Sequence, residues 1–190
     1  SACLVGSEMC IRDRNRERFY MIALRRDKFG KDTFFEFPEP PRIKTRLGDI
    51  LEKDVPDKYT ISDKLWAGHQ RRKKEHQAKG NGFGYCLFNE DSEYTSTISA
   101  RYHKDGSEIL IEQKGKNPRK LTPREAARLQ GYPEDYKIVV SDCQAYHQFG
   151  NAVAVPVIRA LANALKPYLE QIKYDGKIAK AEPLTEGRLV

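Results

Sequence analysis

The chain has 190 residues, 34 of them Lys or Arg and 27 of them Asp or Glu, which gives a formal net charge of +7. Only 39% of the residues are hydrophobic, and no stretch approaches the run of about 18 apolar residues that a membrane span requires, so a membrane-spanning protein is excluded. This length bounds the chain to one large domain or two small ones, and the basic balance favours an anionic partner such as nucleic acid.

The first residues differ in character from the rest of the chain. The segment SACLVGSEMCIRD has no initiating Met and resembles translated adapter sequence, and a strongly patterned sequence begins only at about Arg14. We therefore expect residues 1–14 to be a non-native lead-in.

The cysteines indicate neither a metal site nor a disulfide framework. Cys3, Cys10, Cys86 and Cys143 show no C-x-x-C spacing, and no His stands at a metal-ligand distance from them. We expect reduced thiols in a cytosolic protein and no metal.

The first predicted element is a strand at Phe19–Leu24. This run, FYMIAL, is continuously apolar with charges on each side, which is typical of a strand buried on both faces of a parallel or mixed sheet. Pro38, Pro40 and Pro41 follow and forbid regular structure, so we expect the chain to cross there to a second lobe.

The middle of the chain predicts a helix followed by short strands. Ser62 can cap a helix that runs on through HQRRKKEHQAK, with Ile61 and Trp66 forming a hydrophobic staple. Asp105-Gly106 is a strong hairpin-turn signal. Strand-like patterns occur at Tyr85–Phe88, Thr95–Tyr102 and Glu108–Glu112. We expect a small β-rich lobe.

Two more helices are predicted towards the C-terminus. Thr122 as N-cap, Pro123 at the first position and Glu125 closing a capping box predict a short helix, Pro123–Gln130. After Pro156, apolar residues recur at helical spacing, although Pro167 should end or kink that helix.

Three groups of residues are candidates for function. Arg16 and Arg18 lie on one face of the first strand, where two guanidinium groups suit a phosphate or a carbonyl oxygen, unless they are only solvated charges. The segment His69–Lys79 carries five basic residues before the Gly-rich, aromatic GNGFGYCLF, which indicates nucleic-acid binding or, alternatively, a solvated helix face. Gly150-Asn151 is interpreted as a turn feeding a helix N-terminus, where backbone amides could face an anion.

Read in order, three segments resemble the last three conserved blocks of the cytosine-5 DNA methyltransferases: NRERFYMIA, RKLTPREAARLQGYP and QAYHQFGNAVAVPV. The family places its target-recognition domain between the first and second of these blocks. The segment KEHQAKGNGFGYCLF with TISARYHKDGSEILIEQ further resembles recognition domains of members acting on CCNGG or CCWGG sites, and some on CCGG.

This resemblance implies an α/β fold: the C-terminal part of a Rossmann-like, S-adenosylmethionine-dependent methyltransferase domain with a small β-rich target-recognition domain inserted. It divides the chain into the end of the catalytic domain at 15–42, the recognition domain at 43–118, a return to the catalytic domain at 119–169 and a tail at 170–190. Bacterial cytoplasm is the implied location.

The activity implied by the resemblance is that of a DNA (cytosine-5-)-methyltransferase. The family flips the target cytosine out of duplex DNA, attacks C6 with a thiolate, and transfers a methyl group from S-adenosylmethionine to C5. Its nucleophile lies in a Pro-Cys block and its cofactor loop in a Gly-rich block, both upstream, and neither Cys86 nor Cys143 follows a Pro. We expect this fragment alone to be inactive, with the cofactor bound mainly by the missing N-terminal part.

Site residues follow from the resemblance. Arg16 and Arg18 match the pair that holds the flipped cytosine, although Arg14 stands where the family has Gln. Residues Asn151, Ala152 and Val153 match a cofactor-binding turn, with Ala152 in place of the common Ser. Thr97 matches a Thr that grips phosphate, and Arg101 is expected to read a base edge. The DNA-binding residues expected in all are Arg71, Arg72, Lys73, Lys74, His76, Gln77, Lys79, Asn81, Phe83, Thr97, Ser99, Arg101 and Tyr102.

The implied partner is duplex DNA with a flipped target cytosine, with no membrane, and a cognate restriction endonuclease is left open as a second partner. An alternative from another class is a stand-alone DNA-binding module that never catalyses. It predicts a start codon near Asn15 and no upstream reading frame.

Overall fold

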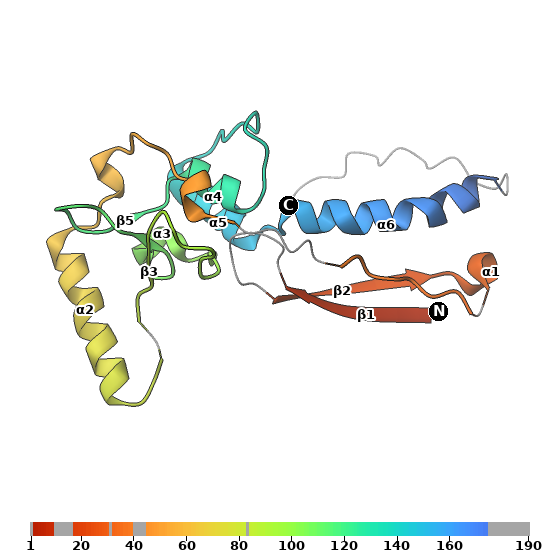
Figure 1. Cartoon of the computed structure of the whole chain (residues 1–190), viewed down its shortest axis with the longest axis horizontal. Coiled ribbons are helices and arrows are strands. Elements are labelled where there is room, and N and C mark those ends of the chain that lie inside the picture. The colour runs from red at the N-terminus through yellow and green to blue at the C-terminus, as the bar shows by residue number, and fades with distance from the viewer. Residues whose placement is uncertain (1, 10–16, 31, 40–44, 83, 175–190) are drawn as a thin grey trace, which may run out of the picture.

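The computed structural model describes residues 2–9, 17–30, 32–39, 45–82 and 84–174. These residues form two parts, each around a hydrophobic core of its own (Figure 1). The first part contains β1 (Ala2–Met9), β2 (Glu17–Leu24), α1 (Arg26–Phe29) and α6 (Val155–Tyr174). The second part contains η1 (Leu47–Asp49), η2 (Asp57–Tyr59), α2 (Asp63–Ala78), β3 (Leu87–Phe88), α3 (Tyr102–Asp105), β4 (Leu110–Ile111), β5 (Arg119–Lys120), α4 (Pro123–Leu129) and α5 (Asp142–Asn151). No helix among these residues is long and apolar enough to cross a membrane.

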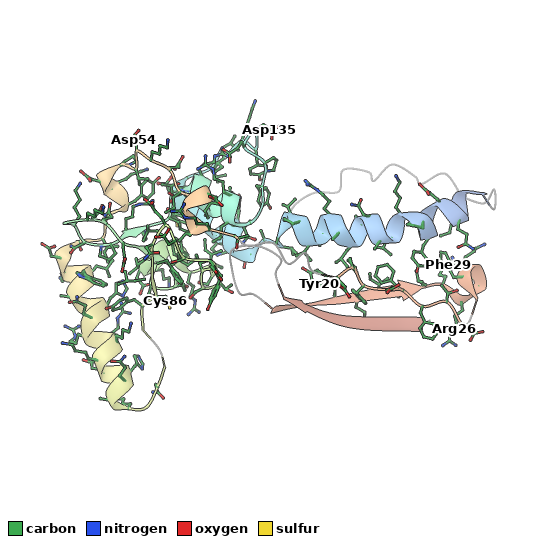
Figure 2. All side chains as sticks on the ribbon, viewed as in Figure 1. Tyr20, Arg26, Phe29, Asp54, Cys86 and Asp135 are labelled. Carbon is green, nitrogen blue, oxygen red and sulfur yellow. The ribbon has the colours of Figure 1, made fainter. Side chains whose placement is uncertain are left out.

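In the first part, α6 packs on one face of a two-stranded sheet. β1 and β2 are antiparallel, in a register that runs from Ala2 opposite Leu24 to Met9 opposite Glu17. Tyr20 and Phe29 lie on the side that faces α6 (Figure 2). The buried residues of this core are Leu24, Phe35, Ala154, Val157 and Leu161.

The prediction that Phe19–Leu24 is buried on both faces is wrong for the described residues. Met21 is 68% exposed, while Ile22 and Leu24 face the core. Successive side chains of a strand alternate between faces, and in the described chain α6 covers only one of them. Residues 1–14, which contain β1, were predicted to be a non-native lead-in. This stays a prediction, because the pairing of β1 with β2 does not show whether the segment is native.

Pro167 was predicted to end or kink α6; the helix does not end there but continues to Tyr174, and a kink stays a prediction. Proline removes the hydrogen bond to the carbonyl four residues earlier. Here that residue, Asn163, is exposed, as is Pro167, so water can solvate the freed carbonyl. Beyond the proline, Tyr168 packs in the core, and its hydroxyl donates to the Phe34 carbonyl at 3.0 Å. These contacts hold the last turns in place.

The second part has a sheet smaller than predicted. β4 lies between a parallel neighbour, β3, and an antiparallel one, β5, and each strand has two residues. The strands predicted at Tyr85–Phe88 and Glu108–Glu112 are thus confirmed in shortened form, whereas β5 was not predicted. The buried core around this sheet consists of Leu47, Ile50, Tyr59, Ile98, Tyr102, Ile109, Ile111, Leu121, Ala126, Ala127, Leu129, Ala145, Tyr146 and Phe149.

The strand predicted at Thr95–Tyr102 and the hairpin turn at Asp105-Gly106 are wrong. The segment is irregular and leads into α3, because Tyr102 is drawn into the core: its hydroxyl donates to the Ile109 carbonyl at 2.6 Å and accepts from the Leu121 amide at 2.8 Å. After α3, Gly106 adopts a φ of +65° and the chain turns without forming a hairpin.

The predicted helix caps are confirmed. The Ser62 hydroxyl accepts from the Leu65 amide at the start of α2. At α4 the full capping box of Thr122 and Glu125 is present, with Pro123 in the first turn. Glu125 does more than cap: it is fully buried and pairs with Arg119, whose side chain is 7% exposed, through two 2.8 Å hydrogen bonds.

Residues 119–149 share their core with the module predicted at 43–118. Leu121, Leu129 and Phe149 pack with Leu47, whereas the following turn and α6 pack against β2. Judged by which core the side chains join, the chain passes from the second part back to the first near Gly150. The domain boundaries implied by the family resemblance remain predictions.

Candidate nucleic-acid interface

Helix α2 extends from the second part (Figure 1) and carries the basic segment identified in the sequence. Arg71, Lys74 and Lys79 are exposed cations, and we call these three residues the α2 basic surface. Arg71 has a side chain that is 73% exposed and lies 3.7 Å from Glu75, one helical turn away. A loose ion pair of this kind leaves the guanidinium accessible to an anion.

Two other cations of the segment are held by the protein itself. Arg72 donates to the Asp105 carboxylate and to Nδ1 of His69. The Lys73 ammonium lies 4.3 Å from the centre of the Tyr85 ring. The cluster Arg71–Lys74 is therefore not uniform: Arg72, whose side chain is still 48% exposed, and half-buried Lys73 contact partners on the module, whereas Arg71 and Lys74 face solvent.

His69 is the buried member of this helix, with 2% of its surface exposed. Burial lowers its pKa, because the low-dielectric surroundings disfavour the charged ring. Asp105 has the opposite balance: burial raises the pKa of its carboxyl, but hydrogen bonds from Ser107, together with the nearby His69 and Arg72, outweigh this and leave the pKa lowered. The structure thus favours a neutral ring beside an ionised carboxylate.

The end of α2 turns back through a short loop that also carries predicted contacts. Gln77 and Asn81 are exposed, His76 is half-buried, and the Asn81 amide donates to the His76 carbonyl at 2.9 Å. Phe83 lies outside the described residues. Gln77 and Asn81 lie beside Lys79 of the α2 basic surface in the sequence.

Residues Thr97 to Tyr102 do not present one common face to a ligand. Ser99 uses its hydroxyl inside the module, where it bonds the Glu108 carboxylate and accepts from the Arg101 amide at 3.1 Å. Arg101 precedes the first residue of α3 and is exposed, and Thr97 is half-buried. The prediction that Tyr102 contacts DNA is wrong, because its side chain is fully buried.

The segment matched to a cofactor-binding turn lies between α5 and α6; we call residues 150–154 the α5–α6 turn. Its first two residues, Gly150 and Asn151, are the last two residues of α5, so their interpretation as a turn feeding a helix N-terminus is wrong. At Gly150 the backbone of Ser99 comes so close that an added Cβ would lie 2.4 Å from it. Only glycine permits this approach.

Sequence reasoning missed Gln130, which fixes the α5–α6 turn at both ends. Its buried side-chain amide donates to the Phe149 carbonyl at 2.5 Å, and its backbone carbonyl accepts from the Val155 amide at 2.9 Å. Gly131 follows with a φ of +77° and packs against Pro156. Only its position in the block RLQGYP could have indicated this residue.

The α5–α6 turn has a chemistry that fits part of S-adenosylmethionine. Asn151 is exposed and offers an amide, which lies 3.3 Å from Nδ1 of His147, and Val153 is 38% exposed and offers an apolar surface. Such a pair can hold one polar and one apolar portion of the cofactor. Ala152, half-buried between them, adds no hydrogen-bonding side chain.

The predicted catalytic arginines are not placed by the structure. Arg16 lies outside the described residues, and Arg18 is described only as a backbone position in β2, opposite Glu8. Of the two cysteines in the second part, Cys86 is half-buried and Cys143 is exposed on α5.

Solved structures share this arrangement. A methyltransferase of Entamoeba histolytica, EhMeth, matches 88% of the chain with a TM-score of 0.65, at 20% identity and over 54% of its own length. The Dnmt2 methyltransferase of S. pombe matches 88% of the chain with a TM-score of 0.62, at 20% identity and over 57% of its length. The predicted fold class, part of a Rossmann-like methyltransferase fold, is confirmed.

Curated relatives are much closer in sequence. The type II methyltransferase M1.ScrFI of Lactococcus lactis subsp. cremoris is 63% identical over 84% of the chain and 41% of its own length. M.SsoII of Shigella sonnei is 65% identical over 80% of the chain and 40% of its length. The chain thus spans about two fifths of these relatives. The family model for C-5 cytosine-specific DNA methylases matches residues 5–167. The chain belongs to the family of C-5 cytosine-specific DNA methylases.

Proposed function

We propose that the chain is the C-terminal portion of a DNA (cytosine-5-)-methyltransferase, which binds duplex DNA in a sequence-specific manner and completes the active site. The observation that carries this proposal is the match at 63% identity to about two fifths of a type II methyltransferase. Its partner is duplex DNA with a flipped cytosine, and a cognate restriction endonuclease is a further partner for an enzyme of this class. The bacterial cytoplasm is the proposed location.

In this proposal the α2 basic surface contacts phosphates. Arg71 and Lys74 are exposed on a projecting helix and Lys79 is exposed at its C-cap, where each phosphate contact releases counterions and strengthens binding at low salt. Arg101, exposed at the start of α3, is the proposed base reader, since a guanidinium can pair with O6 and N7 of guanine. Thr97 is proposed to hold backbone phosphate. Gln77 and Asn81 lie near enough to the basic surface in sequence to join it.

Catalysis is proposed to need residues that this chain does not contain. S-adenosylmethionine, when bound, supplies the methyl group, and Asn151 and Val153 would hold one side of it. Arg16 and Arg18 would orient the flipped cytosine near the atoms where charge develops. Neither Cys86 nor Cys143 is a candidate nucleophile by the Pro-Cys pattern. The chain alone is therefore expected to bind DNA without methylating it, because covalent catalysis requires its nucleophile.

Salt-dependent DNA binding tests the proposal. The affinity for a short duplex with one CCWGG site is measured by fluorescence anisotropy over a series of salt concentrations. Neutralising Arg71 and Lys74 to Gln should flatten the slope of log K against log salt by about 0.9 for each phosphate that the variant no longer neutralises. Lys166→Gln on α6, which removes a comparable exposed charge, serves as the control and should leave the slope unchanged. Equal slopes for all variants would refute the assigned surface.

Methyl transfer and base reading are measured separately. Incubation of the chain with labelled S-adenosylmethionine and duplex DNA should yield no labelled DNA, and any turnover above the blank would contradict the proposed division of the enzyme. Competition between cognate and single-mismatch duplexes should show that Arg101→Ala relaxes discrimination at one base pair, whereas Thr97→Ala weakens both duplexes alike. The reverse outcome would exchange the two roles.

A further inference from the structure

Three residues join the basic helix to the loop region that contains the proposed base reader. His69 and Arg72 come from α2, and Asp105 ends α3. The Arg72 guanidinium lies with Nη1 and Nη2 each 3.3 Å from Oδ2 of Asp105, and Nη2 is also 3.0 Å from Nδ1 of His69. Nε2 of His69 lies 3.2 Å from the Asp105 carbonyl oxygen. We call these three residues the α2 clamp.

The donors and acceptors of the α2 clamp fit one protonation state. A guanidinium can only donate, so Nδ1 of His69 must accept, and Nε2 then carries the hydrogen donated to the Asp105 carbonyl. The second carboxylate oxygen of Asp105 also has partners: Oδ1 accepts from the amide and the hydroxyl of Ser107. The two ring nitrogens of His69, both carboxylate oxygens of Asp105 and the two terminal nitrogens of Arg72 thus each have a definite partner, which favours one position of the helix.

The α2 clamp lies where α2 leaves the body of the module. The first turn is tied by Ser62 and by Asp63, whose carboxylate accepts from Asn117 at 2.6 Å. Beyond Arg72 the helix continues to Ala78, six residues or about 9 Å at 1.5 Å per residue. A swing of about 10° about the clamp would displace the far end by about 1.6 Å, about three times the range of about 0.5 Å that hydrogen-bond lengths span.

The other end of the clamp is anchored in the core of the module. Asp105 lies three residues after Tyr102, which is fully buried with both hydrogen-bonding capacities of its hydroxyl satisfied. Arg101 precedes Tyr102 directly. The clamp therefore connects the phosphate-binding surface on α2 to the short helix that presents the proposed base reader.

We propose that Arg72 is a positioning residue for DNA recognition rather than a phosphate contact: with His69 and Asp105 it holds the α2 basic surface in register with Arg101. This inference rests on the proposed function, because it assigns a role within the same DNA-binding surface. The inference gives Arg72 a different role from Arg71 and Lys74, although the sequence analysis predicted all three as DNA-binding residues.

Charge-conserving substitution separates the two roles of an arginine. Arg72→Lys keeps the positive charge but cannot bridge a carboxylate and an imidazole as the planar fork does. A phosphate contact would survive this change, whereas a clamp should lose about 3- to 10-fold in DNA affinity through weaker preorganisation, with an unchanged salt slope.

Substitution of Asp105 should change DNA affinity in opposite directions, depending on whether Arg72 positions the helix or contacts phosphate. Asp105→Asn removes a negative charge, so electrostatics alone would strengthen DNA binding. In the clamp it should weaken binding, since the new amide nitrogen must face either Arg72 or the Ser107 amide, and both are donors. The Arg72→Lys/Asp105→Asn double variant should bind no more weakly than the weaker single variant, because both changes break one unit.

The experiment measures anisotropy of the labelled CCWGG duplex with the full chain, at a temperature where circular dichroism shows each variant to be folded. Arg46→Lys and Asp91→Asn are the matched controls, an exposed Arg–Asp pair at 2.8 Å on the same module, and neither should weaken binding. Amide exchange in residues 73–78 should accelerate in the clamp variants alone. Unchanged affinity in Arg72→Lys, tighter binding in Asp105→Asn, or unchanged exchange would overturn the inference while leaving DNA binding intact. Failure of the unaltered chain to bind the duplex would instead overturn the proposed function, and the inference with it.

Discussion

Replacing Glu125 by Gln should destabilise the second part more than any surface substitution. Its Oε1 accepts from the Glu52 amide and from Arg119, and its Oε2 accepts from the Thr122 amide and from Arg119, all at 2.8 Å. A glutamine of the same shape places an NH2 group against two of these four donors and leaves Arg119 without a full counter-charge. The loss of two hydrogen bonds to a charged acceptor, at about 1.5–3 kcal/mol each, amounts to about 3–6 kcal/mol. Breaking a buried ion pair costs a similar amount, about 3–5 kcal/mol.

The measurement is equilibrium unfolding in urea, followed by the fluorescence of Trp66, the single tryptophan of the chain, and by circular dichroism. The matched control is Glu134→Gln. Glu134 also pairs with an arginine six residues away, Arg128, through two hydrogen bonds of 2.7 and 2.9 Å, but its side chain is 65% exposed. That control should cost less than about 1 kcal/mol. If Glu125→Gln costs no more than Glu134→Gln, burial does not govern the energy of this pair and the reasoning fails.

Further predictions concern backbone approach and pH. Gly150→Ala should lower the free energy of unfolding by about 1–3 kcal/mol, since its Cβ would meet the Ser99 backbone. Gly68→Ala on α2 is the control: its Cβ meets nothing within 4 Å, and the change should raise the free energy of unfolding by about 0.5–1 kcal/mol. Thermal unfolding of both variants is the measurement, and equal shifts of the midpoint would contradict the close approach at Gly150. Because burial lowers the pKa of His69 below its usual 6.5, the unfolded chain takes up a proton that the folded chain excludes. The free energy of unfolding should therefore fall as pH falls below about 6.5, and this part of the fall should be absent in His69→Gln; parallel pH curves for the two proteins would exclude the effect.

Local signals predicted the helix starts correctly. At Ser62, and at Thr122 with Glu125, the capping groups lie within three residues of their partners, so the sequence contains the whole interaction. Helix α5 was not predicted, although it has a comparable signal: Ser141 caps it by accepting from the Gln144 amide, and its apolar residues recur at helical spacing.

Distant partners explain what the sequence could not predict. The strand predicted at Thr95–Tyr102 does not form, because the Tyr102 hydroxyl bonds the Ile109 carbonyl and the Leu121 amide, and strand propensity is weaker than such tertiary interactions. The role of the basic segment in DNA binding stays a prediction, although composition identified the segment. Its division into exposed cations and a held Arg72 depends on Asp105, 33 residues away, and the close approach at Gly150 depends on Ser99.

The first part joins segments from opposite ends of the chain, and this affects its biosynthesis. Phe34 accepts a hydrogen bond from Tyr168, a separation of 134 residues. At about 5–20 residues per second, a ribosome needs about 7–27 seconds to synthesise the segment between them. Throughout that interval α6, the helix that packs on the apolar face of β2 among the described residues, has not yet been synthesised, while the intervening module can already fold around its own core. Nascent chains of this protein should therefore depend on chaperones at β2, and pausing of translation before α6 should increase aggregation.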